Sequence, residues 1–186
     1  VAARIVRIPN PVDIDRFARP AAFDRVAARH DLGLDDDELV LSFMALGDFA
    51  RKGLGLLIEA LGGLPEADRR ALKFVVIGGQ SSEVTAFKAE AARHGVADRL
   101  VFVGMQADVR PYLWLSDAFA FPSAYEIFSL AILQAAAAGL PVLVSARLYG
   151  ADYKRGRSLA GLVSGLKRLG LRAVVQSRSE ERRVGK

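Results

Sequence analysis

The segment that decides the fold is residues 39–61, which read LVLSFMALGDFARKGLGLLIEAL. Its first eight residues form an apolar, β-rich run, and Leu54–Leu61 carries apolar side chains at helical spacing. Between these two runs lies a short polar turn with two glycines and an Arg-Lys pair. The segment therefore predicts a buried strand, a loop and an amphipathic helix, in that order.

The same order of strand and helix recurs along most of the chain. Besides the strand at Leu39–Leu46, we expect strands at Ile5–Ile8, Lys73–Ile77, Leu100–Val103, Ala118–Phe121 and Val142–Val144, and further helices at Ala21–His30, Glu83–His94, Val109–Leu115 and Ile127–Ala138. Such alternation is typical of a parallel sheet with helices on both faces. We therefore expect an α/β fold over residues 1–146, a Rossmann-like doubly wound parallel sheet with ligands at the carboxyl ends of its strands.

Composition excludes several classes of protein. The chain has 186 residues, of which 52% are hydrophobic and 25% charged, and this balance suits one globular domain. It contains no cysteine, which excludes disulfides, thiolate metal sites and cysteine nucleophiles. Its two histidines, His30 and His94, are too few for ordinary zinc or iron chemistry. The longest apolar stretch, Leu130–Ala146, is interrupted by Gln134 and Pro141, so no membrane-spanning helix is expected.

The net charge of +5 is distributed unevenly. Residues 1–146 hold 15 Lys/Arg and 18 Asp/Glu, whereas residues 147–186 hold 11 Lys/Arg and 3 Asp/Glu. Residues 178–186 resemble the in-frame translation of a short-read sequencing adaptor. We therefore expect residues 147–186 to be an aberrant basic tail from a frameshift or assembly artefact, and the domain to be truncated at both ends. The charge then says nothing about a nucleic-acid partner.

The usual phosphate-binding loops are absent from the sequence. No Walker A motif and no G-x-G-x-x-G motif opens a helix, so a plain ATP or nicotinamide site is unsupported. Instead, Arg51 and Lys52 follow the strand Leu39–Leu46 and precede the start of a helix, where the helix dipole disfavours cations. A bound anion would relieve this conflict, and the alternative is a solvated basic turn.

A second polar group follows the strand Ala118–Phe121. Glu126 lies at or just before the start of the predicted helix Ile127–Ala138, whose free N–H groups could bind a phosphate. Gln134 lies eight residues further on, two turns along nearly the same helix face. The alternatives are an ordinary first-turn acid for Glu126 and a polar helix-edge residue for Gln134.

Taken in order, these motifs resemble a known family. Arg51-Lys52-Gly53, Val101-Phe102-Val103-Gly104, Glu126…Gln134 and Gly139-Leu140-Pro141-Val142 are similar to the nucleotide-sugar-binding, C-terminal half of retaining GT-B glycosyltransferases of family 4, also called group 1. The similarity is greatest to lipopolysaccharide-core glucosyltransferases, which share the Phe-x-Arg-Lys-Gly pattern. It covers about residues 4–146, and it implies that residues 1–146 are a nucleotide-sugar (donor) binding domain.

The resemblance implies specific roles for individual residues. Arg51 and Lys52 would neutralise the donor diphosphate and Glu126 would hold the donor sugar, and these three form the expected catalytic set. The expected donor-binding residues are Gly47, Met105, Gln106, Phe128, Ser129, Leu130 and Gln134. Within that set the amides near Ser129 would meet the phosphates, Met105 and Gln106 the base, and Gln134 the ribose. No metal ion or other cofactor is expected, because the two cations would do that work.

Three positions depart from the family pattern. Gln134 stands where the family has a second acid, Asp48 where an arginine is common, and Ser129 where glycine is usual. These departures leave the identity of the sugar nucleotide open.

The resemblance also implies a function for the longer parent protein. That protein would move a hexose from a nucleotide-diphosphate sugar to a glycan or glycolipid acceptor in cell-envelope polysaccharide biosynthesis. The acceptor would bind a missing N-terminal domain, which would also make any peripheral membrane contact, on the cytoplasmic, inner face of the membrane. This chain alone would bind the donor and be inactive. Two alternatives stay open: a non-catalytic nucleotide-sugar-binding module, suggested by Gln134, and, more remotely, a nucleic-acid-binding protein, suggested by the net charge.

Overall fold

The computed structural model describes residues 11–126 and 128–144, and within them five parallel strands form one sheet in the order β3-β2-β1-β4-β5. The strands are β1 (Leu39–Ala45), β2 (Leu72–Gly78), β3 (Leu100–Gly104), β4 (Ala118–Phe121) and β5 (Val142–Val144). The expected strand Ile5–Ile8 and the expected basic tail lie outside the described residues.

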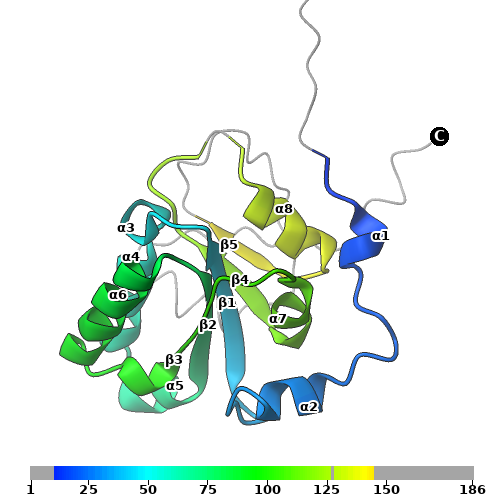
Figure 1. Ribbon diagram of the computed structural model, residues 1–186. Coiled ribbons are helices and arrows are strands. Elements are labelled where there is room, and N and C mark those ends of the chain that lie inside the picture. Colours follow the sequence, from blue (N-terminus) through cyan, green and yellow to red (C-terminus); the bar gives the residue numbers. More distant parts are fainter. Residues whose placement is uncertain (1–10, 127, 145–186) are drawn as a thin grey trace, which may run out of the picture.

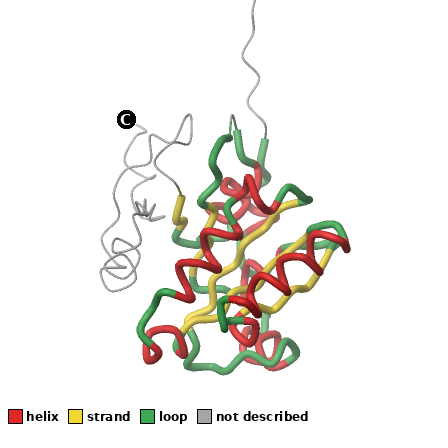
Figure 2. Tube along the Cα trace, turned by 90° about the vertical axis from the view of Figure 1, so that its left-hand side faces the viewer, coloured by secondary structure: helices red, strands yellow, loops and turns green. Residues whose placement is uncertain are grey.

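Helices cover both faces of this sheet. They are α1 (Ile14–Phe17), α2 (Arg25–His30), α3 (Phe49–Lys52), α4 (Leu54–Gly62), α5 (Glu66–Arg70), α6 (Ser81–Arg93), the 3-10 turn η1 (Ala97–Arg99), α7 (Arg110–Leu115) and α8 (Leu130–Ala137). Figure 1 shows α4 and α6 on one side of the strands and α7 and α8 on the other. In Figure 2 the strands run as one twisted sheet between helices. The predicted doubly wound α/β fold is confirmed.

The strands read as nearly continuous apolar runs because the sheet is buried on both faces. Every residue of β4 and β5 is buried, as is β1 from Val40 onward. Phe43, Phe49 and Phe121 are among the largest fully buried side chains. The Phe43 ring stacks on Phe121 at 5.7 Å and meets Phe49 edge-on at 5.6 Å between centroids. These aromatic contacts tie β1, β4 and the start of α3 into one core beneath the carboxyl edge of the sheet.

Several helix boundaries differ from expectation. Helix α8 begins at Leu130 rather than Ile127, because the Ser129 side chain caps it by accepting a hydrogen bond from the Ile132 amide at 3.5 Å. Helix α2 begins at Arg25 rather than Ala21, because the Asp24 side chain caps it by accepting a hydrogen bond from the Ala27 amide. The short helices α1, α3 and α5 were not predicted.

The order of the strands creates a crevice between β1 and β4. After β1 the chain crosses to β2 on one side, whereas β4 pairs with β1 on the other side. The chain thus crosses from β1 to β2 in one direction and from β4 to β5 in the other, which is the arrangement at which open α/β sheets bind ligands.

Candidate functional site

A pocket of about 720 Å³ opens at this carboxyl edge, within the size range of small-molecule sites. Its lining comes from the segments that follow β1, β3 and β4, together with α1, α7 and α8. All of the site residues predicted from the sequence line it: Gly47, Arg51, Lys52, Met105, Gln106, Glu126, Phe128, Ser129, Leu130 and Gln134. The structure thus brings the whole predicted set together, and the roles assigned to its members stay predictions.

The segment after β1 is folded differently from the loop that we expected. Arg51 and Lys52 lie in the last turn of the short helix α3, where cations suit the helix dipole. Gly53, in the left-handed conformation at φ +90°, then separates α3 from α4. Both cations still lie just before α4, which begins at Leu54 as expected, so their predicted place ahead of a helix start is confirmed, but the end of α3 offsets the unfavourable effect of the α4 dipole on them. The case for an anion at this place rests on the pocket instead.

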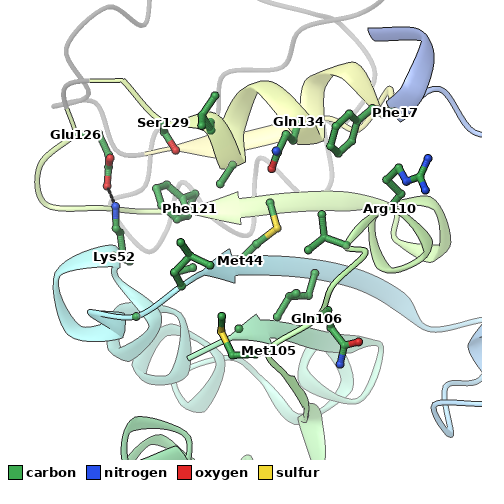
Figure 3. A pocket seen from close by; sticks show the side chains of 18 of the residues that line it. Phe17, Met44, Lys52, Met105, Gln106, Arg110, Phe121, Glu126, Ser129 and Gln134 are labelled. Atoms are coloured by element: carbon green, nitrogen blue, oxygen red, sulfur yellow. Dashed lines mark hydrogen bonds and ion pairs between the residues drawn. The ribbon is translucent and has the colours of Figure 1, made fainter. Parts of the chain in front are cut away.

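Lys52 and Glu126 point toward each other at one end of the pocket, as Figure 3 shows. The Lys52 Nζ donates to Glu126 Oε1, and Arg51 Nη1 donates to the same oxygen at 3.4 Å. The side chains of Lys52 and Glu126 are only 18% and 11% exposed, so this ion pair is largely screened from bulk water. Lys52 Nζ also lies 5.4 Å from the centre of the Phe121 ring.

Asp48 extends this group of charges. It is the only residue other than glycine with positive φ (61°) among those that the structure describes. Its Oδ2 accepts a hydrogen bond from Arg51 Nε at 2.5 Å. The hydrogen bond to Arg51 lowers the pKa of Asp48 and raises the pKa of Arg51. Asp48, Arg51, Lys52 and Glu126 together form a charge cluster with two charges of each sign.

Gly53 allows the segments after β1 and β4 to meet. A Cβ at this position would lie 2.4 Å from the carbonyl oxygen of Pro122, so no larger residue fits without movement of the backbone. Just beyond Pro122, the Ala124 amide donates to the Arg51 carbonyl at 2.9 Å. This close approach is what places Lys52 beside Glu126.

The start of α8 lies beside the charge cluster. Because α8 begins at Leu130, Glu126 is not a first-turn acid but sits in the loop four residues before the helix. Ser129 is the N-cap, and Phe128 and Leu130 are 46% and 42% exposed on either side of it. The Ser129 cap reaches only the Ile132 amide, so the other amides of the first helical turn have no partner within the helix.

The opposite end of the pocket combines apolar and amide groups with two arginines, Arg16 and Arg110. Figure 3 shows Gln106, Phe17 and Arg110 gathered there, with Gln134 between them and Ser129. Gln106 Nε2 donates to the carbonyl of Val103 at 2.5 Å, which fixes its side-chain amide. The sequence reasoning missed Phe17 and Arg110 as lining residues.

Phe17 and Arg110 are each held in place by a neighbouring side chain. Trp114 Nε1 donates to the Phe17 carbonyl at 2.7 Å and so fastens α1 beside α7. Arg110 donates to both carboxylate oxygens of Asp108, at 2.8 and 2.6 Å. A four-residue helix gives no periodic signal, so α1 could not have been found from the sequence.

The two ends of the pocket therefore differ in the chemical groups that they offer to a ligand. One end combines two cations, one carboxylate and a helix start. The other end offers amide and apolar groups together with Arg16 and Arg110, of which Arg110 is paired with Asp108. Such a pocket suits a ligand that joins an anionic group to a flat, neutral one. Among residues 11–126 and 128–144 there is no group of three His, Asp or Glu side chains able to hold a metal ion, and no helix there is long and apolar enough to cross a membrane.

Comparison with known proteins gives consistent matches. The family profile described as "Glycosyl transferases group 1" matches residues 40–163. The D-inositol 3-phosphate glycosyltransferase of Xylanimonas cellulosilytica is 36% identical over 151 residues, which cover 77% of this chain and 35% of that protein.

Solved structures also match. The crystal structure of WaaG, a glycosyltransferase involved in lipopolysaccharide biosynthesis, has a TM-score of 0.60 and 31% identity over 68% of this chain and 34% of WaaG. Anabaena Alr3699/HepE in complex with UDP-glucose has a TM-score of 0.65 and 25% identity over 76% of this chain and 38% of that protein. The chain thus spans about a third of the length of the proteins that it matches.

Proposed function

This chain belongs to the group 1 glycosyltransferase family, and from that premise we propose that it forms the donor-binding part of a GT-B enzyme. The enzyme transfers a hexose from a nucleotide-diphosphate sugar to a glycan or glycolipid acceptor. The acceptor-binding part lies in the rest of the protein, since the relatives are about three times as long as the stretch they share with this chain. The chain by itself binds the donor and does not turn it over.

The observation that carries this proposal is that two cations and a helix start meet at one end of the pocket, while amide and aromatic groups line the other end. Lys52 and Arg51 lie at the end where α8 begins, so cations and amide groups surround one volume suited to a diphosphate. Gln106 and Phe17 lie at the other end, where a nucleobase finds amide and aromatic partners. Anabaena HepE, solved with UDP and with UDP-glucose, supports the same class of ligand.

The roles of Gln134 and Glu126 follow from this orientation of the nucleotide sugar in the pocket. Gln134 lies between the two ends, where the ribose of the nucleotide passes, and its neutral amide can accept and donate hydrogen bonds there. Glu126 lies at the cationic end, beside the diphosphate, where the donor sugar is attached. The Glu126 carboxylate accepts hydrogen bonds from the hydroxyl groups of that sugar.

The residues of this pocket act on the leaving group. In transfer with retained configuration, the bond between the anomeric carbon and the diphosphate oxygen breaks, and the oxygen of an acceptor hydroxyl bonds to the same face of the sugar while its proton passes to the departing diphosphate. Negative charge grows on the diphosphate as that bond breaks, and Arg51, Lys52 and the α8 amides stabilise it. This arrangement serves the reaction without a metal ion.

The experiment that tests the proposal is a calorimetric titration of the chain with UDP and with UDP-glucose. We expect Lys52→Ala to weaken the binding of both by about tenfold or more, because contacts between charged groups contribute about 1.5–3 kcal/mol. The matched control is Lys88→Ala. Lys88 is also a lysine placed over an aromatic ring, Phe102, at 5.7 Å, but it lies on α6 outside the pocket. Failure of the unaltered chain to bind either ligand, or equal effects of the two substitutions, would refute the proposal.

A further inference from the structure

A fully buried serine sits between the two segments that build the cationic end of the pocket. Ser123 is 0% exposed, and its Oγ lies 3.1 Å from Glu126 Oε1, 3.1 Å from the Tyr125 carbonyl and 3.3 Å from the Arg51 carbonyl. A serine hydroxyl has one proton, so it can make one strong donation among these three oxygens.

The two carbonyls are already supplied with other donors. Arg51 Nη1 donates to the Tyr125 carbonyl at 2.8 Å, and the Ala124 amide donates to the Arg51 carbonyl at 2.9 Å. The Glu126 carboxylate is charged and is therefore the strongest acceptor of the three. Of these three oxygens, Glu126 Oε1 is therefore the preferred acceptor of the Ser123 hydroxyl.

In the part of the chain that the structure describes, every hydrogen bond to the Glu126 carboxylate reaches the same one of its two oxygens. Ser123, Lys52 and Arg51 all donate to Oε1. Among the described residues no hydrogen bond reaches Oε2, although Glu126 lines the pocket. An ionised carboxylate accepts at both oxygens, so Oε2 keeps its capacity for a ligand hydroxyl.

We infer that Ser123 is a positioning residue, which anchors Glu126 by Oε1 so that Oε2 is presented to a hydroxyl group of the donor sugar. This inference rests on the proposed function and adds to it a buried residue that does not line the pocket. Lys52 and Arg51 also hold Oε1, but the diphosphate draws on both cations when the donor binds. Ser123 is neutral and buried, so it keeps its hold on the carboxylate in that state.

The test compares UDP-glucose with UDP, which lacks the sugar. The dissociation constants of UDP and UDP-glucose are measured calorimetrically for the unaltered chain and for Ser123→Ala, and the ratio of the two constants reports the contribution of the sugar. We expect Ser123→Ala to weaken UDP-glucose binding by about fivefold and to leave UDP binding within about twofold. Ser123→Thr, which keeps the hydroxyl, should keep the ratio of the unaltered chain.

The matched control is Ser42→Ala. Ser42 is also 0% exposed, and its hydroxyl donates to the Ala118 carbonyl at 3.4 Å inside the sheet, so the substitution removes an equally buried hydroxyl away from the pocket. It should leave the ratio unchanged. Should circular dichroism show that Ser123→Ala is unfolded, Ser123→Cys decides, because the thiol keeps the volume but donates weakly and should shift the ratio in the same direction.

An unchanged ratio in Ser123→Ala, or an equal loss for both ligands, would overturn the role of Ser123 while leaving the donor site standing. Failure of the unaltered chain to bind UDP would instead overturn the proposed function itself.

Discussion

Replacing Gly53 by alanine tests how the pocket is held together. Gly53 has φ +90°, and a residue with a Cβ in a left-handed conformation costs about 1–2 kcal/mol. The added Cβ would lie 2.4 Å from the Pro122 oxygen and 2.8 Å from the Pro122 carbonyl carbon, so the two segments must part by about 1 Å to reach ordinary contact. Overpacking of this kind costs about a further 1–3 kcal/mol. We therefore expect Gly53→Ala to lower the free energy of unfolding by about 2–5 kcal/mol.

The same movement should weaken nucleotide binding. Parting the segments carries Lys52 away from Glu126 and from the start of α8, and a misplacement of about 1 Å at a site can cost on the order of 100-fold in rate. We expect UDP to bind at least about tenfold more weakly to Gly53→Ala at a temperature where the variant is folded.

Urea denaturation measures the stability, and calorimetric titration with UDP measures the binding. The control is Gly95→Ala, because Gly95 also has positive φ (68°) but a Cβ added to it would meet nothing within 4 Å, so only the backbone strain is introduced. It should cost about 1–2 kcal/mol and leave UDP binding unchanged. If Gly53→Ala proves no worse than Gly95→Ala in both measurements, the close approach does not hold the site together.

Three further predictions concern other parts of the molecule. In the full-length enzyme, Lys52→Ala should lower kcat by about 10²–10³-fold, because its charge stabilises the departing diphosphate. Gln134→Ala should act mainly on KM, because a neutral hydrogen bond to ribose is the same in the ground and transition states. An equal loss of kcat in the two variants, measured by steady-state kinetics, would contradict this division. Arg29→Ala should lower the free energy of unfolding in urea by about 3–5 kcal/mol and leave UDP affinity unchanged, because the buried Arg29 guanidinium binds Asp117 and three backbone carbonyls outside the pocket. Arg51 lowers the pKa of Asp48 in the folded state, so Asp48 stabilises the fold above the unfolded pKa of about 3.9, and this contribution is lost as the pH falls through the lower folded pKa. Asp48→Asn should therefore flatten the dependence of the free energy of unfolding in urea on pH below about pH 4. An unchanged slope in that range would refute the role of Asp48.

The sheet and the position of the pocket could be predicted because both depend on local pattern. Strands β4 and β5 match the expected boundaries at both ends, since burial on both faces makes each an unbroken apolar run. Arg51, Lys52, Glu126 and Ser129 follow strands in the sequence, and the carboxyl ends of parallel strands share one edge, so their convergence could be predicted from the pattern. The other pocket residues were expected from the resemblance to the family.

The missed features depend on contacts that no local pattern records. Helix α5 (Glu66–Arg70) has no buried residue and hence no apolar periodicity to detect. Phe17 lines the pocket because its backbone is fastened to Trp114, a residue 97 positions away in the sequence. The hydrogen bond from Ser123 to the Arg51 carbonyl and the pairing of Lys52 with Glu126 likewise join segments that only the folded sheet brings into contact.

The charge cluster of Asp48, Arg51, Lys52 and Glu126 bears on how fast a ligand arrives. Two positive and two negative groups within hydrogen-bonding distance of one another largely cancel each other's field beyond the first few ångströms. A nucleotide approaching through solvent is then guided little by these residues, and its association rate should depend only weakly on ionic strength. The full attraction of Lys52 and Arg51 develops after contact, when the ligand phosphates compete with Glu126 for the same donors. The protein therefore discriminates between ligands through their dissociation rates rather than through their association rates.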